Sequence, residues 1–167
     1  MRVVVMGVTG CGKSTVGRRL AHDLRAEFAD ADDFHAPEAV AKMAAGTPLE
    51  DEDRWPWLDG VGMWLSDRGS AVVACSALKR VYRDCIRDIA GEEVVFIHLD
   101  ARQEVLEPRV RKRAQQEGHF AGPGLLDSQY EALERLEDDE RGGRVDVERN
   151  APEGAALVAR AILDAAR

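Results

Sequence analysis

Residues 3–14 read Val-Val-Val-Met-Gly-Val-Thr-Gly-Cys-Gly-Lys-Ser, and this stretch decides the fold. Its first four residues form an apolar run typical of a buried strand. After the stretch, Val16, Leu20 and Leu24 recur at the spacing of one helix face. Between strand and helix, residues 7–14 match the pattern G-x-x-x-x-G-K-[ST], which binds phosphate in that context. The stretch therefore predicts a nucleoside triphosphate site at the start of an α/β domain.

The loop pattern gives each of its characteristic residues a task. Gly7 and Gly12 allow backbone angles that a Cβ disfavours, so the loop N–H groups can surround an anion. Lys13 can reach the β- and γ-phosphates, and the Ser14 hydroxyl can ligate Mg²⁺. The following helix adds the positive end of its dipole. The expected nucleotide-binding residues of the loop are Gly7, Val8, Thr9, Gly10, Cys11, Gly12, Lys13, Ser14 and Thr15.

Composition limits the class of protein. With 167 residues, 45% of them apolar and 32% charged, the chain is long enough for one globular domain with a sizeable core. A net charge of −8 argues against a nucleic-acid-binding surface. Three cysteines are poor material for a disulfide framework, no signal peptide precedes the loop, and no apolar run reaches the ~20 residues of a membrane span. We therefore expect a cytoplasmic protein without a membrane or nucleic-acid partner.

Apolar runs alternate with helical patterns along the whole chain. Strands are predicted at 2–6, 27–30, 71–75, 94–99 and 144–147. Helices are predicted at 13–26, 36–45, 53–68, 77–89, 101–117, 125–136 and 153–166. This order predicts a single α/β domain over residues 1–167, in which helices flank a five-stranded parallel sheet in three layers. Residues 31–69 interrupt the alternation as an acceptor-binding insertion, and the loop-rich residues 114–126 are expected to form a mobile lid.

Two aspartates lie where the second predicted strand ends, at the edge of the sheet where ligands bind. Asp30 and Asp32 are two residues apart, so on an extended chain both side chains point the same way. One carboxylate is suited to hold a Mg²⁺-bound water, and the other to accept a hydrogen bond from an attacking hydroxyl. The competing interpretation is an acidic loop that caps the next helix, which is all that Asp33 needs to do.

Cations recur in the segments that follow the third strand and precede the lid. Lys79 and Arg83 share one helix face, as do Arg109 and Arg113, and guanidinium groups suit phosphate oxygens. Arg54 stands among acidic residues and tryptophans, where a surface ion pair is the simpler interpretation. Solvated helix faces explain the other cations equally well. The four histidines show no zinc-binding spacing, so no zinc site is expected.

The blocks Asp-x-Asp-x-Phe-His at 30–35, Asp-Arg-x-Pro-Trp-Leu at 53–58 and Cys-Ser-Ala-Leu-Lys-Arg-x-Tyr-Arg-Asp at 75–84 together resemble the gluconokinase family. Further matches bring the resemblance to residues 6–129. It implies a fold similar to shikimate and nucleoside monophosphate kinases, and phosphorylation of D-gluconate at its 6-hydroxyl with ATP and Mg²⁺. It also implies substrate-binding roles for Asp32, His35, Arg54, Lys79, Arg83, His119 and Gln129. Arg109 and Arg113 match family arginines that border the lid.

The resemblance gives the residues roles in one hypothetical reaction, the transfer of the ATP γ-phosphoryl group to gluconate. Lys13 binds phosphate, while Ser14 holds Mg²⁺ with help from Asp30 through water. Asp32 orients the 6-hydroxyl and is placed to deprotonate it. Arg54 and Arg113 neutralise charge on the transferring group. The catalytic residues are thus predicted to be Lys13, Asp32, Arg54 and Arg113.

Several positions depart from the family pattern and leave alternatives open. Ala31 and Ala39 replace the family's usual glycine and asparagine, and residues 114–117 lengthen the lid. A kinase of another small hydroxy acid, such as a shikimate-like one, is therefore an alternative, and a P-loop NTPase switch is a more distant one. A homodimer is compatible with the sequence. Cys11 stands where the family commonly has serine; it either supplies only its backbone N–H or has a lowered thiol pKa that makes it oxidant-sensitive.

Overall fold

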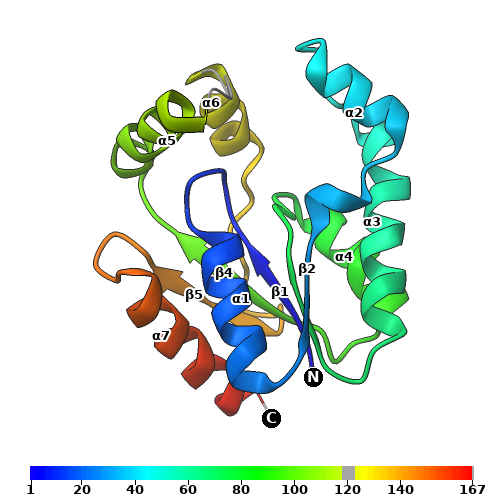
Figure 1. Ribbon diagram of the computed structural model, residues 1–167. Coiled ribbons are helices and arrows are strands. Elements are labelled where there is room, and N and C mark those ends of the chain that lie inside the picture. The colour runs from blue at the N-terminus through cyan, green and yellow to red at the C-terminus, as the bar shows by residue number, and fades with distance from the viewer. Residues whose placement is uncertain (118–122, 167) are drawn as a thin grey trace.

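The first strand lies at the centre of a parallel sheet. The structure, a computed structural model, describes residues 1–117 and 123–166, with the side chains of residues 117 and 123 left out. Five strands pair in the order β2-β3-β1-β4-β5, all parallel (Figure 1). They are β1 Arg2–Met6, β2 Glu27–Asp30, β3 Ala71–Ala74, β4 Val95–Asp100 and β5 Gly142–Asp146. Val4 of β1 pairs with Val73 on one side and Phe96 on the other, which confirms the predicted five-stranded sheet.

Helices connect the strands close to where the sequence pattern placed them. They are α1 Lys13–Leu24, α2 Pro37–Ala44, α3 Asp51–Ser66, α4 Arg80–Ala90, α5 Gln103–Glu117, α6 Pro123–Ala132 and α7 Pro152–Ala165. The starts of α3, α5 and α6 differ from the prediction by two residues and the end of α6 by four, whereas α4 begins at Arg80 rather than at residue 77. Ala77 has a left-handed φ of 42°, and Lys79 is extended as the N-cap, so neither residue can belong to the helix. A short 3₁₀ helix, η1 (Ala31–Phe34), also follows β2.

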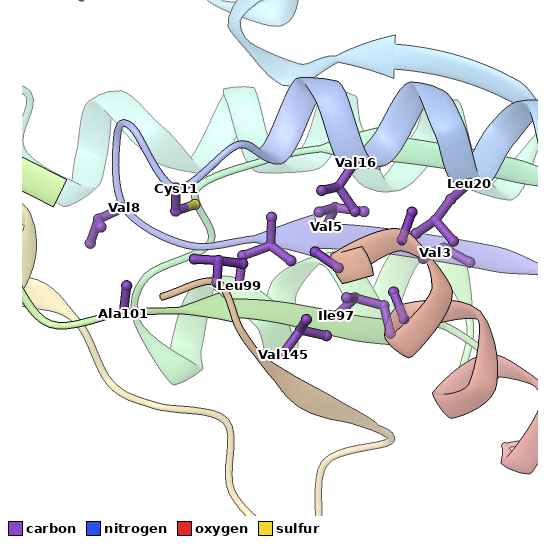
Figure 2. Close-up of a cluster of buried hydrophobic side chains, with 14 of the residues drawn as sticks. Val3, Val5, Val8, Cys11, Val16, Leu20, Ile97, Leu99, Ala101 and Val145 are labelled. Carbon is purple, nitrogen blue, oxygen red and sulfur yellow. The ribbon is translucent and has the colours of Figure 1, made fainter. Parts of the chain in front are cut away.

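The alternation of side chains along β1 divides the core into two layers. Val3 and Val5 are fully buried in a cluster with residues of α1 and α7 (Figure 2). Val4 and Met6 are fully buried in a second cluster, against α3 and α4. Apolar runs without polar interruption are therefore explained by burial on both faces of the sheet.

The ends of the strands, rather than the core, position the functional residues. The loop after β1 lies between two groups of helices at the carboxyl edge of the sheet: α5 and α6 stand on one side, and η1, α2 and α3 on the other (Figure 1). Sequence reasoning expected the lid and the acceptor insertion in these two places. None of the helices in the described residues is long and apolar enough to cross a membrane.

Candidate active site

The phosphate loop is shaped by its glycines. Gly7 has a φ of 139°, and a Cβ there would lie 2.7 Å from the carbonyl oxygen of Leu99 in β4. Gly12, at a φ of 96°, is the left-handed N-cap from which α1 begins. The Lys13 ammonium donates to the Val8 carbonyl at 3.0 Å, so the side chain folds back over the loop. The loop is thus a preformed concave backbone with one cation at its mouth, which suits a polyphosphate.

Ser14 and Asp30 meet beside this loop, although they belong to different elements. The Ser14 hydroxyl donates to Asp30 Oδ2 at 2.6 Å, and Asp30 Oδ1 accepts the backbone N–H of Asp32 at 3.1 Å. A hydroxyl and a carboxylate are hard oxygen donors, and Mg²⁺ typically takes only one or two protein ligands beside water and substrate phosphate. The pair therefore fits Mg²⁺. Among residues 1–117 and 123–166, no group of three or more His, Cys, Asp or Glu could hold a metal by itself.

Asp32 and His35 follow on the turn that η1 makes after β2. The pKa of Asp32 is raised, chiefly because surrounding protein displaces water from its carboxylate and secondly because Asp30 is close. The His35 ring stacks on Trp57, with ring centres 4.5 Å apart and planes 11° apart. Burial lowers the pKa of His35, although Asp32 opposes the shift. The Asp32 carboxylate thus follows directly on the Ser14–Asp30 pair, and the His35 imidazole interacts with Asp32 in turn.

A second cluster of charges forms around Tyr82 of α4. The carboxylate of Asp51 accepts from the Lys79 ammonium at 3.1 Å and from the Tyr82 hydroxyl. The guanidinium carbon of Arg54 lies 5.8 Å from the centre of the Tyr82 ring, and the Lys79 nitrogen lies 5.4 Å from it. The Arg54 guanidinium is also fixed by a 2.5 Å hydrogen bond to the carbonyl of Leu49. Two cations from separate segments therefore lie at one aromatic ring, where they can attract an anion together.

The prediction that Arg83 binds substrate is wrong in this structure. Its side chain is fully buried, and its guanidinium makes two hydrogen bonds to the carboxylate of Glu140, at 2.6 and 2.8 Å. Its remaining nitrogen donates to three backbone carbonyls, those of Ala77, Leu78 and Glu134. All of its hydrogen-bonding groups face protein, so none is available to a substrate.

The other predicted residues lie on the α5–α6 side. The Gln129 side-chain oxygen accepts the backbone N–H of Thr9 at 2.6 Å, which places Gln129 against the phosphate loop rather than beside Lys79 and Arg54. Arg109 of α5 donates to the Val147 carbonyl at 3.2 Å, at the loop after β5. Arg113 lies one helical turn further along α5. His119 and part of the predicted lid, residues 118–122, lie outside the described residues.

Cys11 does not have the lowered thiol pKa that was one of the two predictions for it. Its side chain is 3% exposed and lies in the apolar cluster between β1, α1 and β4, as Figure 2 shows. Burial raises its thiol pKa, an effect larger than the opposing attraction of Lys13. The idea of a lowered pKa is therefore wrong, because the sulfur lies in the apolar core and its burial outweighs the nearby charge of Lys13.

Sequence reasoning missed residues that support the site. Asp51 and Tyr82 were given no role in the site, yet Asp51 accepts from Lys79 and Tyr82 offers its ring to the same ammonium. Trp57 supplies the surface on which His35 stacks and donates its indole N–H to the Ala31 carbonyl at 2.6 Å. The position of Tyr82, three residues after Lys79 on the start of a helix, was a usable signal. Nothing in the sequence pattern singled out Glu140.

Comparison with known proteins agrees with this geometry over nearly the whole chain. The family profile described as shikimate kinase matches residues 9–141. A gluconokinase of Gluconobacter oxydans is 42% identical over 154 residues, which cover 89% of this chain and 83% of that protein. The crystal structure of a gluconokinase from Sinorhizobium meliloti is 40% identical, with a TM-score of 0.89 and coverage of 98% of this chain and 91% of that one.

A sugar kinase from a Janibacter species is 47% identical in its crystal structure, with a TM-score of 0.88, and the match covers 98% of this chain and 94% of that one. The family profile and these relatives agree on a P-loop kinase. Identities of about 40% over most of both chains leave little room for a different family. The chain therefore belongs to the gluconokinase family, within the shikimate-kinase-like P-loop kinases.

Proposed function

We propose that this protein is an ATP-dependent gluconokinase that forms 6-phosphogluconate and ADP. The single observation that carries the proposal is the contact between the donor side and the acceptor side of the active site. The Ser14–Asp30 pair of the donor side bonds directly to the backbone of Asp32, the candidate base for the acceptor. A site for phosphate and a site for a hydroxyl thus adjoin. The family membership gives the acceptor its identity, because gluconate is the substrate that the relatives' names specify.

On the donor side, the loop N–H groups and Lys13 would bind the β- and γ-phosphates of ATP. Lys13 would have to exchange its bond to the Val8 carbonyl for the phosphates, which is a local change of side-chain conformation. Ser14 would hold Mg²⁺ directly and Asp30 through water. When bound, that ion supplies neutralisation of phosphate charge. Arg109 and Arg113 of α5 are proposed to close over the nucleotide as residues 114–126 act as a lid.

On the acceptor side, residues 31–69 are proposed to bind gluconate. Asp32 is placed to accept the proton of the 6-hydroxyl, and its raised pKa brings it nearer the range useful for a base. Arg54 would neutralise charge on the transferring phosphoryl group, and Lys79 would attract the carboxylate of gluconate. Both roles use cations that the Tyr82 cluster already holds in place. His35 Nδ1 is buried and has no partner among the described residues, so it would bond to a substrate hydroxyl only after a side-chain movement that exposes it.

A coupled assay tests the proposal. The purified protein is mixed with ATP and Mg²⁺ and with gluconate, shikimate or another hydroxy acid, and a reaction without acceptor serves as the control. We expect ADP formation that depends on gluconate, with one phosphate ester at O6 by phosphorus NMR. A preference for shikimate would reassign the acceptor. Equal ADP release with and without any acceptor would overturn the kinase proposal and favour an NTPase switch.

Two further predictions concern the cellular compartment of the protein and its oligomeric state. All three cysteines are free, which supports the proposal that the protein works in a reducing compartment such as the cytoplasm. The homodimer that the sequence left open stays a prediction. Light scattering of the purified protein at assay concentration distinguishes a dimer from a monomer.

A further inference from the structure

The buried ion pair of Arg83 and Glu140 joins two segments that border the site. One is the acceptor loop, residues 75–79, which links β3 to α4. The other is the return segment, residues 133–141, which links α6 to β5. Arg83 donates to the carbonyls of Ala77 and Leu78 in the first segment and of Glu134 in the second, at 3.2, 3.2 and 3.0 Å. The Glu134 N–H adds a direct 2.9 Å bond to Leu78.

Stability alone is a weak reason for such a pair. Both side chains are fully excluded from water, and removing two charges from water costs much of what their attraction returns. Apolar side chains of similar volume can do as well or better in such a position. A guanidinium, unlike an apolar group, can bind several carbonyls and a carboxylate in a fixed plane. The geometry of Arg83 therefore favours a role in setting the positions of the two segments.

The acceptor loop has a conformation that needs external support. Ala77 has a φ of 42°, a left-handed angle that is costly for a residue with a Cβ, and its carbonyl is one of those that Arg83 holds. Two residues later, Lys79 leaves the loop to reach Asp51 and Tyr82. The carbonyl of Ser76, in the same loop, accepts the N–H of Gly7 at 3.3 Å. A change at Ala77 would therefore displace Lys79.

We propose that Arg83 and Glu140 form a positioning pair, which holds the acceptor loop and the return segment together so that Lys79 meets the acceptor carboxylate. This inference rests on the proposed function for the identity of that acceptor. The pair touches no reacting atom itself. Its loss should therefore weaken acceptor binding more than nucleotide binding. The phosphate loop is shaped chiefly by its own glycines and meets the acceptor loop through the bond from the Gly7 N–H to the Ser76 carbonyl.

Arg83→Lys is the first test, because lysine keeps the charge but cannot bind a carboxylate and three carbonyls together. Loss of such a supporting contact predicts a rise of about 10-fold or more in the KM for gluconate. The KM for ATP should stay within about 2-fold, since uniform loss of folded protein would change kcat rather than one KM. Arg87→Lys is the matched control, because Arg87 lies one turn further along α4 and pairs with Asp84 and Glu92 instead.

The double substitution Arg83→Met with Glu140→Met separates positioning from stability. We expect this variant to melt at a higher temperature than Glu140→Met alone, because no buried charge is left unpaired, but below the wild type, because the carbonyls that Arg83 held lose their donor. The gluconate KM should stay raised. A gluconate KM restored to the wild-type value would overturn the proposal. Should the double variant fail to fold, Arg83→Lys decides the question, and an unchanged gluconate KM in that variant would contradict the proposal.

A readout without substrate keeps this inference separate from the proposed function. The Glu134 N–H bonds to the Leu78 carbonyl, so its hydrogen exchange reports whether the two segments are held together. We expect faster exchange at Glu134 in Arg83→Lys than in Arg87→Lys. Equal exchange would overturn the positioning role, whichever acid the wild type phosphorylates. A wild type that ignores gluconate would contradict the proposed function and leave the exchange measurement to decide this inference.

Discussion

The phosphate loop takes its shape from consecutive residues between β1 and α1, whereas the acceptor side collects Asp32, Arg54 and Lys79 from η1, α3 and the loop before α4. The loop is built from backbone angles, such as the φ of 139° at Gly7. The acceptor side is built from side chains that hold one another, such as Asp51 with Lys79 and Tyr82. The phosphate loop should therefore tolerate substitutions elsewhere in the chain, whereas the acceptor side depends on residues from several segments. Substitutions on the two sides should therefore separate nucleotide binding from acceptor turnover.

Asp32→Asn should have the largest effect. If Asp32 accepts the proton of the attacking hydroxyl, its loss lowers kcat by about 10²- to 10⁴-fold. Nucleotide affinity should stay within about 2-fold of the wild type, because Ser14, Asp30 and the loop are unchanged. Steady-state kinetics and calorimetry of nucleotide binding check both statements. Asp33→Asn is the control: the residue is an exposed neighbour on the same turn. Near-normal turnover in Asp32→Asn would remove Asp32 from the mechanism.

The pH dependence gives Asp32 a second, independent check. The base must be ionised, so kcat/KM for the acceptor should be constant above the pKa and fall tenfold per pH unit below it. Because the pKa of Asp32 is raised, this fall should begin at a higher pH than an ordinary aspartate, near ~4, would give. The nucleotide dissociation constant should not follow the same curve. A profile whose acid limb persists unchanged in Asp32→Asn would assign that limb to another group.

Lys79→Gln should affect the acceptor side alone and less severely. A hydrogen bond to a charged group is worth about 1.5–3 kcal/mol, so the gluconate KM should rise about 10- to 100-fold. The KM for ATP should be unaffected, because Lys79 contacts Asp51 and the Tyr82 ring rather than the phosphate loop. Lys112→Gln, an exposed lysine of α5, is the matched control. An equal rise in both KM values would mean that the two sides are not separable.

Gly7→Ala tests the donor side in the same way. Its backbone angle costs a residue with a Cβ about 1–3 kcal/mol, and the new Cβ would also lie 2.7 Å from the Leu99 carbonyl and 2.8 Å from the Cys11 sulfur. We expect about a tenfold loss of nucleotide affinity and a lower melting temperature. The control is Gly69→Ala, since a Cβ at that glycine meets nothing within 4 Å. An ATP affinity equal to the wild type would show that the loop tolerates another shape.

The same contrast explains how much of the molecule could be predicted from its sequence. The apolar runs predicted the sheet, and the loop pattern placed the donor site, because both depend on residues adjacent in sequence. Lys79 and Arg83 have the same charge and were expected on one helix face, yet Lys79 precedes the helix and lies by Tyr82, and Arg83 is buried against Glu140. Only the path of the return segment decides between them, and no local pattern encodes a partner 57 residues away.

Cys11→Ala should have the smallest effect, although the residue is in the middle of the phosphate loop. The loop is expected to bind phosphate through the backbone of residue 11. The Cys11 sulfur packs into the core beside Gly7, so it is not exposed to a bound phosphate. Kinetic constants should change by less than about 2-fold, and the loss of stability should be about 1 kcal/mol for a small cavity.

Because burial raises the thiol pKa of Cys11, the folded protein should also resist iodoacetamide at neutral pH. The same protein unfolded in denaturant, in which Cys11 should be labelled, serves as the control for labelling by mass spectrometry. Rapid labelling of Cys11 with loss of ATP binding would mean that the loop opens to solvent, and the donor side would then be less preformed than its backbone indicates.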